Sequence, residues 1–271
     1  MNPNKKTYKL LVLTDLQRSL SKMLKVTVGM AKMINGEIEV FHVKKPADIV
    51  TSDNQLSAMR TINSKHKTID KKIQNLITPV EKESGMKIPY SFAFGNVKNE
   101  ISSYIKKRQP DIIVLGKRKS KPFSLIGDSI TEFVLNVHDG VVLITTDKNV
   151  LLPNEEISLG MLNNSKPFLN FAFAENLNKH IQKPVKSFKI IKNSTAKKEV
   201  SKAIDDETIE YVFEQNDGTI KNLSNYLSKN NISLLSIDRG QKDSDYAKKL
   251  MPVDISSIIN KLNIPLLISG K

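Results

Sequence analysis

The chain has 271 residues, more than a single hydrophobic core usually requires, so its length predicts about two domains. It contains no cysteine, which excludes disulfides and thiolate metal sites, while a hydrophobic content of 39% supports buried cores. The net charge of +14 is uneven: residues 1–150 carry 25 Lys and Arg against 14 Asp and Glu, whereas residues 151–271 carry 17 against 14, so the basic first half indicates an anionic partner without identifying it.

The first half alternates between two periodic patterns. Apolar runs typical of strands covered on both faces predict strands at residues 8–14, 37–43, 87–95, 111–116 and 141–145. Apolar residues at steps of three and four predict helices at residues 20–34, from beyond Pro46 to near Gly85, at 97–105 and at 128–137. Strands that alternate with helices in this way indicate an α/β fold with a parallel, doubly wound sheet.

The second half repeats this order of elements in a shorter form. Strands are expected at residues 156–162, 184–191, 208–215, 232–238 and 264–270, with helices starting near Lys166, at Gly218 and near Asp254. Placing residues 132–145 over residues 256–269 superimposes helix on helix and strand on strand, and brings Asn136 onto Asn260. We therefore expect two domains with five-stranded sheets, at 1–148 and 155–271, joined by a polar linker at about 149–154.

Several stretches of the sequence carry a resemblance to a known family. "KLLVLTD" lies in the first strand, "FHV" closes the second, "FGNVKNEI" leads into the third helix, and "DIIVLGKRKSKPFSLIGDSITEFVL" precedes "GVVLIT". Together they resemble the universal stress protein (UspA-like) family over nearly the whole first half. The second half is similar only in its element order and its final "NIPLLIS", so the chain resembles a tandem universal stress protein with a degenerate second copy.

The resemblance implies an adenine nucleotide alpha hydrolase-like fold and a stress-response protein that binds and regulates rather than catalyses. It also implies pairing through the last strands. Here the apolar edges "VVLIT" and "IPLLIS" can meet within one chain as an internal pseudo-dimer, which covers edges that otherwise promote aggregation. A homodimer of two crossed chains is the alternative.

The family's phosphate loop is matched imperfectly. Members that bind ATP carry G-x2-G-x9-G-[S/T] between the fourth strand and the last helix; here Gly116 matches the first glycine, Lys119 replaces the second, and Gly127 comes two residues early. In the other register Ser129 takes the hydroxyl position and Asp128 displaces the glycine. Glycine matters there because phosphate oxygens approach backbone N–H groups closely, and a Cβ blocks that approach.

Charge is expected to replace part of this lost glycine geometry. The ammonium of Lys119, with Lys117, Arg118 and Lys121 beside it, attracts phosphate as a point charge. Asp128 repels phosphate unless a cation such as Mg²⁺ lies between them. The resemblance therefore implies weak binding of an adenine nucleotide, ATP, ADP or AMP, through a modified phosphate loop.

Three further residues match the family around the same pocket. Thr14 and Asp15 occupy its "TD" position at the carboxyl end of the first strand, and Val43 matches the residue whose backbone faces adenine. In an open parallel sheet a ligand binds at the carboxyl ends of the strands where the winding reverses, so Thr14, Asp15 and Gly116 should border one crevice. Two structural alternatives stay open: Asp15 caps the following helix near Ser19, and the loop glycines serve turn geometry alone.

The second half departs from the family pattern at each of these positions. The repeat alignment puts Asn163 in place of the aspartate of "TD", and Asp238 or Ile237 in place of the first glycine. Met251–Pro252 replace residues 127–128 of the loop. We therefore expect no nucleotide in the second half, and a structural or partner-binding role for it.

Other function classes leave weaker signals. The basic run at residues 117–122 is an alternative site for nucleic acid, but it lacks interleaved aromatic residues for base stacking. A slow ATP hydrolase that uses Asp15 is a second alternative, although no motif assembles a nucleophile, a base and an oxyanion site, so no catalytic residue is assigned. The four histidines lack metal-ligand spacing and are interpreted as structural. Without an apolar leader or membrane-length run, we expect a cytoplasmic protein.

Overall fold

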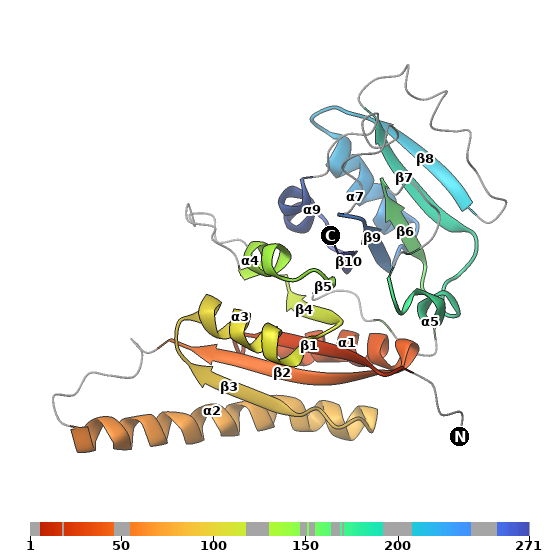
Figure 1. Cartoon of the computed structure of the whole chain (residues 1–271). Helices are drawn as coiled ribbons and strands as arrows, with labels where there is room; N and C mark the ends of the chain where they lie inside the picture. The colour runs from red at the N-terminus through yellow and green to blue at the C-terminus, as the bar shows by residue number, and fades with distance from the viewer. Residues whose placement is uncertain are drawn as a thin grey trace.

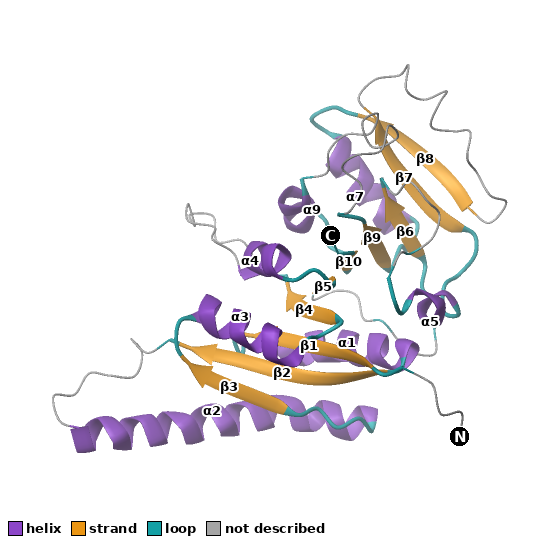
Figure 2. Ribbon diagram, viewed as in Figure 1, coloured by secondary structure: helices purple, strands orange, loops and turns teal. Residues whose placement is uncertain are grey.

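The structure is a computed structural model that describes residues 6–17, 19–45, 55–117, 130–146, 151, 155–163, 169, 171–191, 208–239 and 254–270; within 55–62 it describes the backbone only. Strands from both halves of the chain form one ten-stranded sheet in the order β3-β2-β1-β4-β5-β10-β9-β6-β7-β8. Figure 1 shows this arrangement along the chain, and Figure 2 shows it by type of element.

The first half forms a doubly wound unit. Its described strands are β1 (Tyr8–Thr14), β2 (Gly36–Lys44), β3 (Tyr90–Phe94), β4 (Ile112–Gly116) and β5 (Val141–Thr145), and its described helices are α1 (Leu20–Ile34), α2 (Gln55–Ser84), α3 (Val97–Arg108) and α4 (Ile130–Val137). β1 pairs in parallel with both β2 and β4, so the chain winds first to one side of β1 and then to the other. Buried residues of α1 and α2 pack on one face of the sheet, and those of α3 and α4 on the other.

The second half repeats this strand order. Its described elements are β6 (Leu159–Leu162), α5 (Ala174–Asn178), β7 (Val185–Ile191), β8 (Thr208–Glu214), α7 (Thr219–Lys229), β9 (Leu234–Ile237), α9 (Ile255–Lys261) and β10 (Leu266–Ile268). Read from the outer edge inward, β8-β7-β6-β9-β10 corresponds strand by strand to β3-β2-β1-β4-β5. The predicted α/β fold class, with two doubly wound five-stranded units, is confirmed, and the two units are continuous as one ten-stranded sheet.

The two halves join through their last strands. β5 and β10 run antiparallel, with Leu143 opposite Leu267, Ile144 opposite Leu266 and Val142 opposite Ile268. This pairing is symmetric about Leu143 and Leu267, as in a two-fold axis between two subunits. The predicted meeting of the apolar edges "VVLIT" and "IPLLIS" within one chain is therefore confirmed, and it removes both edges from solvent.

Short polar residues set several helix ends. Asn35 follows α1 in the left-handed conformation, at φ 60°, and ends the helix at residue 34, as the periodicity predicted. Asn96 caps α3 by accepting from the backbone N–H groups of Lys98 and Asn99. Asp254 caps α9 in the same way, through the N–H of Ser256.

Some predicted boundaries differ from the structure. The strand predicted at 87–95 begins only at Tyr90, because the Ile88 N–H donates to Glu81 Oε1 at 2.7 Å and Pro89 has no N–H to offer a ladder. Lys166 and residues 128–129, where helices were expected to begin, lie outside the described residues. In those regions the structure describes α5 and residues 130–137 of α4.

Contacts across the halves extend beyond the central strand pair. The Tyr8 hydroxyl donates to the Ala172 carbonyl at 2.6 Å, and the Asn176 amide donates to the Ile34 carbonyl at 3.2 Å. Each face of the sheet carries one apolar cluster, and each of these clusters contains core residues from both halves. The division into domains at 1–148 and 155–271 stays a prediction. Among the described residues, no helix has the length and apolar character needed to cross a bilayer.

Candidate functional site

The reversal of winding in the first half lies between β1 and β4. Leu13 of β1 pairs with Leu115 of β4, so Thr14 and Gly116 follow at adjacent positions where both strands end. On the other side of β1, Thr14 pairs with His42 of β2. His42, Thr14 and Gly116 thus lie in one row across three neighbouring strands, at the place where ligands bind in open α/β sheets.

His42 is the residue at this edge that sequence reasoning did not select. Its Nδ1 lies 2.8 Å from the Thr14 carbonyl oxygen, and because a carbonyl only accepts, Nδ1 carries the proton. Burial lowers the pKa of His42 below its usual value. The hydrogen bond to Thr14 opposes this shift in part. A neutral imidazole therefore links β2 to the end of β1.

The turn after β1 is held by its own side chains. The Thr14 hydroxyl oxygen accepts from the Leu16 N–H at 3.0 Å, and Asp15 Oδ1 accepts from the Gln17 N–H at 3.3 Å. Leu16 is buried with φ at 59°, a left-handed conformation that is rare for leucine. Ser19 is the N-cap of α1, and its side chain makes no capping hydrogen bond.

The described part of the structure does not require glycine at position 116. It ends β4 without a left-handed φ, and among the described residues an added Cβ would meet only the Met23 sulfur, at 3.4 Å, which is an ordinary contact. The turn-geometry alternative for Gly116 therefore lacks support. Glycine at this position places no side chain beside Thr14 at the carboxyl edge of the sheet.

Of the remaining predicted site residues, the structure describes only Val43. Val43 follows His42 in β2, is half-buried and pairs with Ala93 of β3, so its backbone lies near the same carboxyl edge. Lys119, Gly127 and Ser129 lie outside the described residues, and their predicted roles stay predictions.

Lys117 is not placed as the sequence analysis expected. Side chains alternate along a strand, so Gly116 faces the α1 layer and Lys117 faces the opposite layer of α4 and α9. There the Lys117 ammonium donates to the carbonyls of Asn260 and Leu262 and to Asn263 Oδ1. The hypothesis that Lys117 supplies charge to a phosphate is wrong in this structure, because its three donors are used in the second half.

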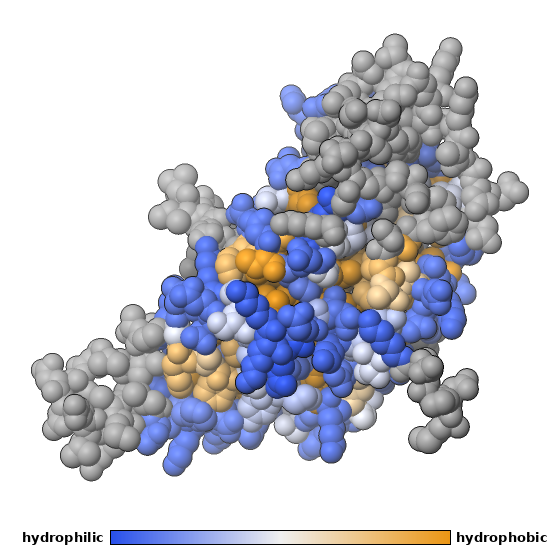
Figure 3. All heavy atoms as spheres, in the orientation of Figure 1, coloured by the Kyte–Doolittle hydropathy of each residue, from blue (hydrophilic) through white to orange (hydrophobic). Residues whose placement is uncertain are grey.

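The described surface charge of the first half has a structural explanation at α3. Figure 3 shows hydrophilic side chains gathered over this helix. Its last turn carries Lys106, Lys107 and Arg108, where positive charge complements the helix dipole. Arg108 also pairs with Glu39 at 2.7 Å. This surface does not require a nucleic-acid partner.

The second half carries different residues at the same edge. Following the strand registers outward from Leu143 and Leu267 brings Asp238 to the position of Gly116, Asn163 to that of Thr14 and Lys189 to that of His42. This corrects the repeat alignment, which put Asn163 one residue later, at Asp15, and left Ile237 as an alternative for the glycine position. The shift arises because strand pairing, and not loop length, sets the correspondence.

These second-half residues are engaged with their surroundings. Asn163, left-handed at φ 53°, accepts the Ile190 N–H through Oδ1 at 2.7 Å. Asp238 Oδ1 accepts from the Ser269 hydroxyl at 2.8 Å. Lys189 is 4% exposed, and burial lowers its pKa to about 8, with Glu210 opposing that shift. A carboxylate replaces the open space at Gly116, and a buried amine replaces the neutral imidazole.

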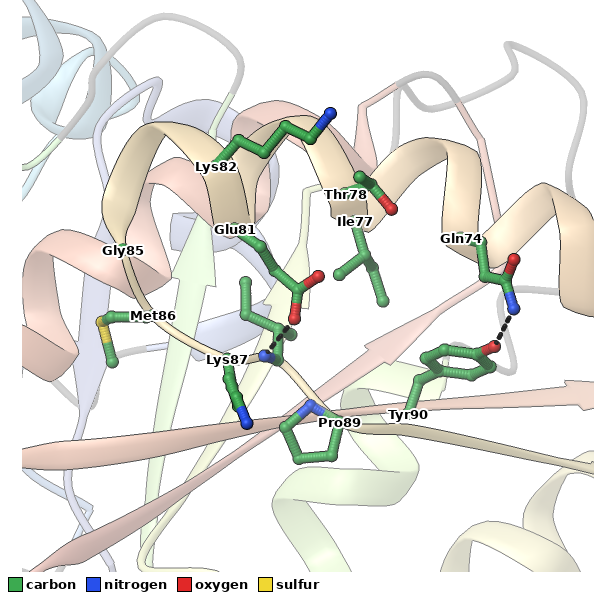
Figure 4. A pocket seen from close by; sticks show the side chains of 11 residues that line it. Gln74, Ile77, Thr78, Glu81, Lys82, Gly85, Met86, Lys87, Pro89 and Tyr90 are labelled. Atoms are coloured by element: carbon green, nitrogen blue, oxygen red, sulfur yellow. Dashed lines mark hydrogen bonds between the residues drawn. The ribbon is translucent and has the colours of Figure 1, made fainter.

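A cavity of about 840 Å³ lies elsewhere, beside the outer edge of the sheet between the end of α2 and the segment that leads into β3 (Figure 4). Its lining contains none of the predicted site residues. Polar groups around it bond to one another: Gln74 donates to the Tyr90 hydroxyl at 2.9 Å, and Glu81 accepts from Ile88. We place the candidate site at the carboxyl edge because a glycine and hydrogen-bonding groups coincide there with the winding reversal.

No cluster of three or more potential metal ligands occurs within the described ranges, which end before residue 118 and resume at 130 around the loop. The described groups at the site are a hydroxyl, a carboxylate, backbone amides and a neutral imidazole. Because the Thr14 oxygen accepts from Leu16, its own hydrogen can be donated to a ligand. This arrangement suits binding of a polar molecule.

The fold and this edge define a doubly wound α/β protein in which one strand order occurs twice. The model of the universal stress protein family matches residues 7–145, just over half of the chain, and the protein belongs to this family. A sequence search of curated proteins finds no match.

Some solved structures resemble the chain along nearly its whole length, and others match about half of it. A universal stress protein from Archaeoglobus fulgidus DSM 4304 has a TM-score of 0.64 and 16% identity, covering 97% of this chain and 96% of that one. A functionally unknown protein from Pseudomonas aeruginosa PAO1 has a TM-score of 0.54 and 10% identity, covering 96% and 92%. A universal stress protein in complex with cAMP matches 52% of this chain and 98% of that one, with a TM-score of 0.40 and 13% identity. At these identities the similarity concerns the fold alone.

Proposed function

We propose that the protein is a tandem universal stress protein whose first half binds an adenine nucleotide, ATP, ADP or AMP, and whose second half is a degenerate copy that does not. In this proposal the protein acts by binding and regulation, not by catalysis. Thr14, Asp15, Val43 and Gly116 border the ligand. Lys119, Gly127 and Ser129, on the loop that the family uses for phosphate, complete the site.

The observation that carries this proposal is the presence of glycine, at Gly116, at a strand end beside the winding reversal. The backbone conformation of Gly116 suits any residue, and the described residues leave room for a Cβ, yet glycine ends the strand beside the winding reversal. Close approach of a ligand to the backbone explains a glycine that the fold does not need. The adjacent Thr14 hydroxyl supplies a donor for a phosphate or ribose oxygen.

The second half offers a contrast that supports the same proposal. At the position of Gly116 it carries Asp238, whose side chain would fill the corresponding space and whose charge repels phosphate. The two halves share strand order and joining geometry, so the difference at this edge is chemical.

Calorimetry with ATP, ADP and AMP tests the proposal on the full chain, alongside mass analysis of nucleotide released from denatured protein. The wild type should bind at least one of the three, and Gly116→Ala should bind about tenfold or more weakly while unfolding at the same temperature, since a methyl group meets only Met23. Asp238→Ala is the matched control in the second half and should leave the affinity unchanged.

The outcomes separate the alternatives. Absence of both binding heat and carried-over nucleotide in the wild type would overturn the proposal. Binding to DNA duplex with a steep salt dependence would favour the nucleic-acid alternative. Phosphate release that disappears in Asp15→Ala would show a slow hydrolase.

A further inference from the structure

The residue after β4 reaches into the other half of the molecule. The ammonium of Lys117 donates to the Asn260 carbonyl at 2.9 Å, the Leu262 carbonyl at 2.7 Å and Asn263 Oδ1 at 3.0 Å. These acceptors lie at and just beyond the carboxyl end of α9, where helix carbonyls lack partners within the helix. All three ammonium protons therefore have an acceptor, and all three acceptors belong to the second half.

Arg239, two residues after the end of β9 at Ile237, makes the reciprocal contact. The Arg239 guanidinium donates through Nη1 to the Leu135 carbonyl and through Nη2 to the carbonyls of His138, at 3.2 Å, and Gly140, at 3.0 Å. These carbonyls lie at and beyond the carboxyl end of α4 in the first half. Its Nε also donates to Ser269, within its own half.

Strand register shows that the two contacts are equivalent. From the central pair Leu143–Leu267, the registers bring Lys117 onto Arg239, each one residue beyond the strand-end positions of Gly116 and Asp238. Leu262 and His138, whose carbonyls both accept, correspond in the same way. Each basic residue thus crosses to the last helix of the opposite half; Figure 1 shows α4 and α9 as neighbours.

These contacts differ from solvated surface lysines and arginines. Burial lowers the pKa of Lys117 and that of Arg239, so both cations are partly withdrawn from water. Neither forms a described ion pair within 4.0 Å, and both are held by uncharged oxygens at helix ends, where the helix dipole favours a positive charge.

We propose that Lys117 and Arg239 form a reciprocal clamp between the halves, and that Lys117 is a positioning residue for the candidate site. The Lys117 backbone N–H donates to the Thr145 carbonyl at 2.8 Å, and its side chain donates to the second half. Both the backbone and the side chain of Lys117 therefore fix the position of the chain directly after Gly116. The second half, in this view, is a built-in partner that orders the start of the phosphate loop. The ligand part rests on the proposed nucleotide site.

Backbone hydrogen exchange in the full chain tests the clamp. The reporters are two equivalent amides at the helix ends, Leu262 N–H, bonded to Ile258, and His138 N–H, bonded to Val134. Lys117→Met should speed exchange at Leu262 by about tenfold or more, and Arg239→Met should do so at His138. A crossed pattern is expected, because each substitution frees the helix of the opposite half. Lys117→Arg, which keeps a cation, should restore most of the protection.

Nucleotide affinity tests the positioning role, with Arg239→Met as the matched control. Lys117→Met should weaken ATP binding several-fold, and Arg239→Met should leave it unchanged although it removes the equivalent contact. Equal loss of ATP affinity in both variants would show that Lys117 stabilises the protein without positioning the site. An exchange pattern that is not crossed, or no change in exchange, would overturn the clamp. If the wild type binds no nucleotide, the proposed function fails while the exchange data still decide the clamp.

Discussion

The carboxyl edges of the two halves share one backbone arrangement and carry opposite chemistry. In the first half this edge holds Thr14, a neutral His42 and the open space at Gly116. At the equivalent positions, the second half holds Asn163 and Asp238 bonded into the structure, and a buried Lys189. The two halves share the strand order around the joint between them, while their strand ends, which contribute little to that joint, carry different residues.

The second half contributes structural contacts that do not depend on its carboxyl edge. The β5–β10 pairing and the crossed contacts of Lys117 and Arg239 need only strands and helix ends from the second half. They do not need its carboxyl edge to bind anything. A half without a ligand site can therefore still serve the half that we propose to have one.

The largest expected effect concerns Lys189. Its pKa is about 8 in the folded chain against 10.5 when exposed, so at pH 7 the buried charge costs about 3 kcal/mol. Lys189→Met should raise the free energy of unfolding by as much as about 3 kcal/mol at pH 7, measured by urea denaturation.

The pH dependence provides the check on Lys189. Between pH 8 and 10.5 the unfolded chain retains a proton that the folded chain has released, so wild-type stability should rise with pH across this range. The rise should be much smaller in Lys189→Met. An unchanged pH profile in the variant would show that Lys189 does not titrate in this range.

Moving the second-half residue into the first half tests the edge directly. Gly116→Asp should weaken nucleotide binding about 100-fold, or about 2.7 kcal/mol, because it adds both a side chain and a negative charge beside the phosphates. Calorimetry with ATP measures the effect, and comparison with Gly116→Ala separates volume from charge. If both variants bound ATP as tightly as the wild type, the ligand would not lie at Gly116.

Asn163 should show a smaller effect, on stability alone. Asn163→Gly keeps the left-handed conformation and removes the acceptor of the buried Ile190 N–H, which should cost about 1 to 2 kcal/mol in urea denaturation. Asn163→Asp retains an acceptor oxygen and serves as the control. A glycine variant as stable as the wild type would mean that the Ile190 N–H finds another partner.

The smallest expected effect concerns His42. Because its pKa is lowered in the folded chain, the unfolded chain takes up a proton first as the pH falls below 6.5, and stability should decline there. His42→Asn, which keeps a donor for the Thr14 carbonyl, should make this decline smaller. NMR titration of the His42 ring should give a pKa below 6.5, and a higher value would contradict the burial argument.

Several features of the fold were predictable from the sequence. Continuous apolar runs such as residues 8–14 and 141–145 predicted the strands, and helical periodicity predicted both ends of α1 and the carboxyl end of α2. The aligned residues 142–144 and 266–268 predicted the symmetric joint. These predictions succeed because periodicity reflects which side chains are buried, and burial is the dominant local signal.

The candidate site was predictable in part. The resemblance selected Thr14 and Gly116, and the structure brings them to adjacent strand ends. It missed His42, because one histidine in a strand is indistinguishable from a packed core residue until its neighbour is known. It assigned Lys117 to the phosphate loop, because adjacency in the sequence does not show which face of the sheet a side chain meets.

Two kinds of information therefore decide this protein. Pattern and composition determined the α/β class, the repeated order of elements, the apolar joining strands and the basic first half, because these depend on residue types at regular spacing. The partner of Lys117, the crossing contact of Arg239 and the correspondence of Asn163 with Thr14 follow from strand register and from packing between distant segments. Such contacts join residues more than 100 positions apart, and no local pattern specifies them.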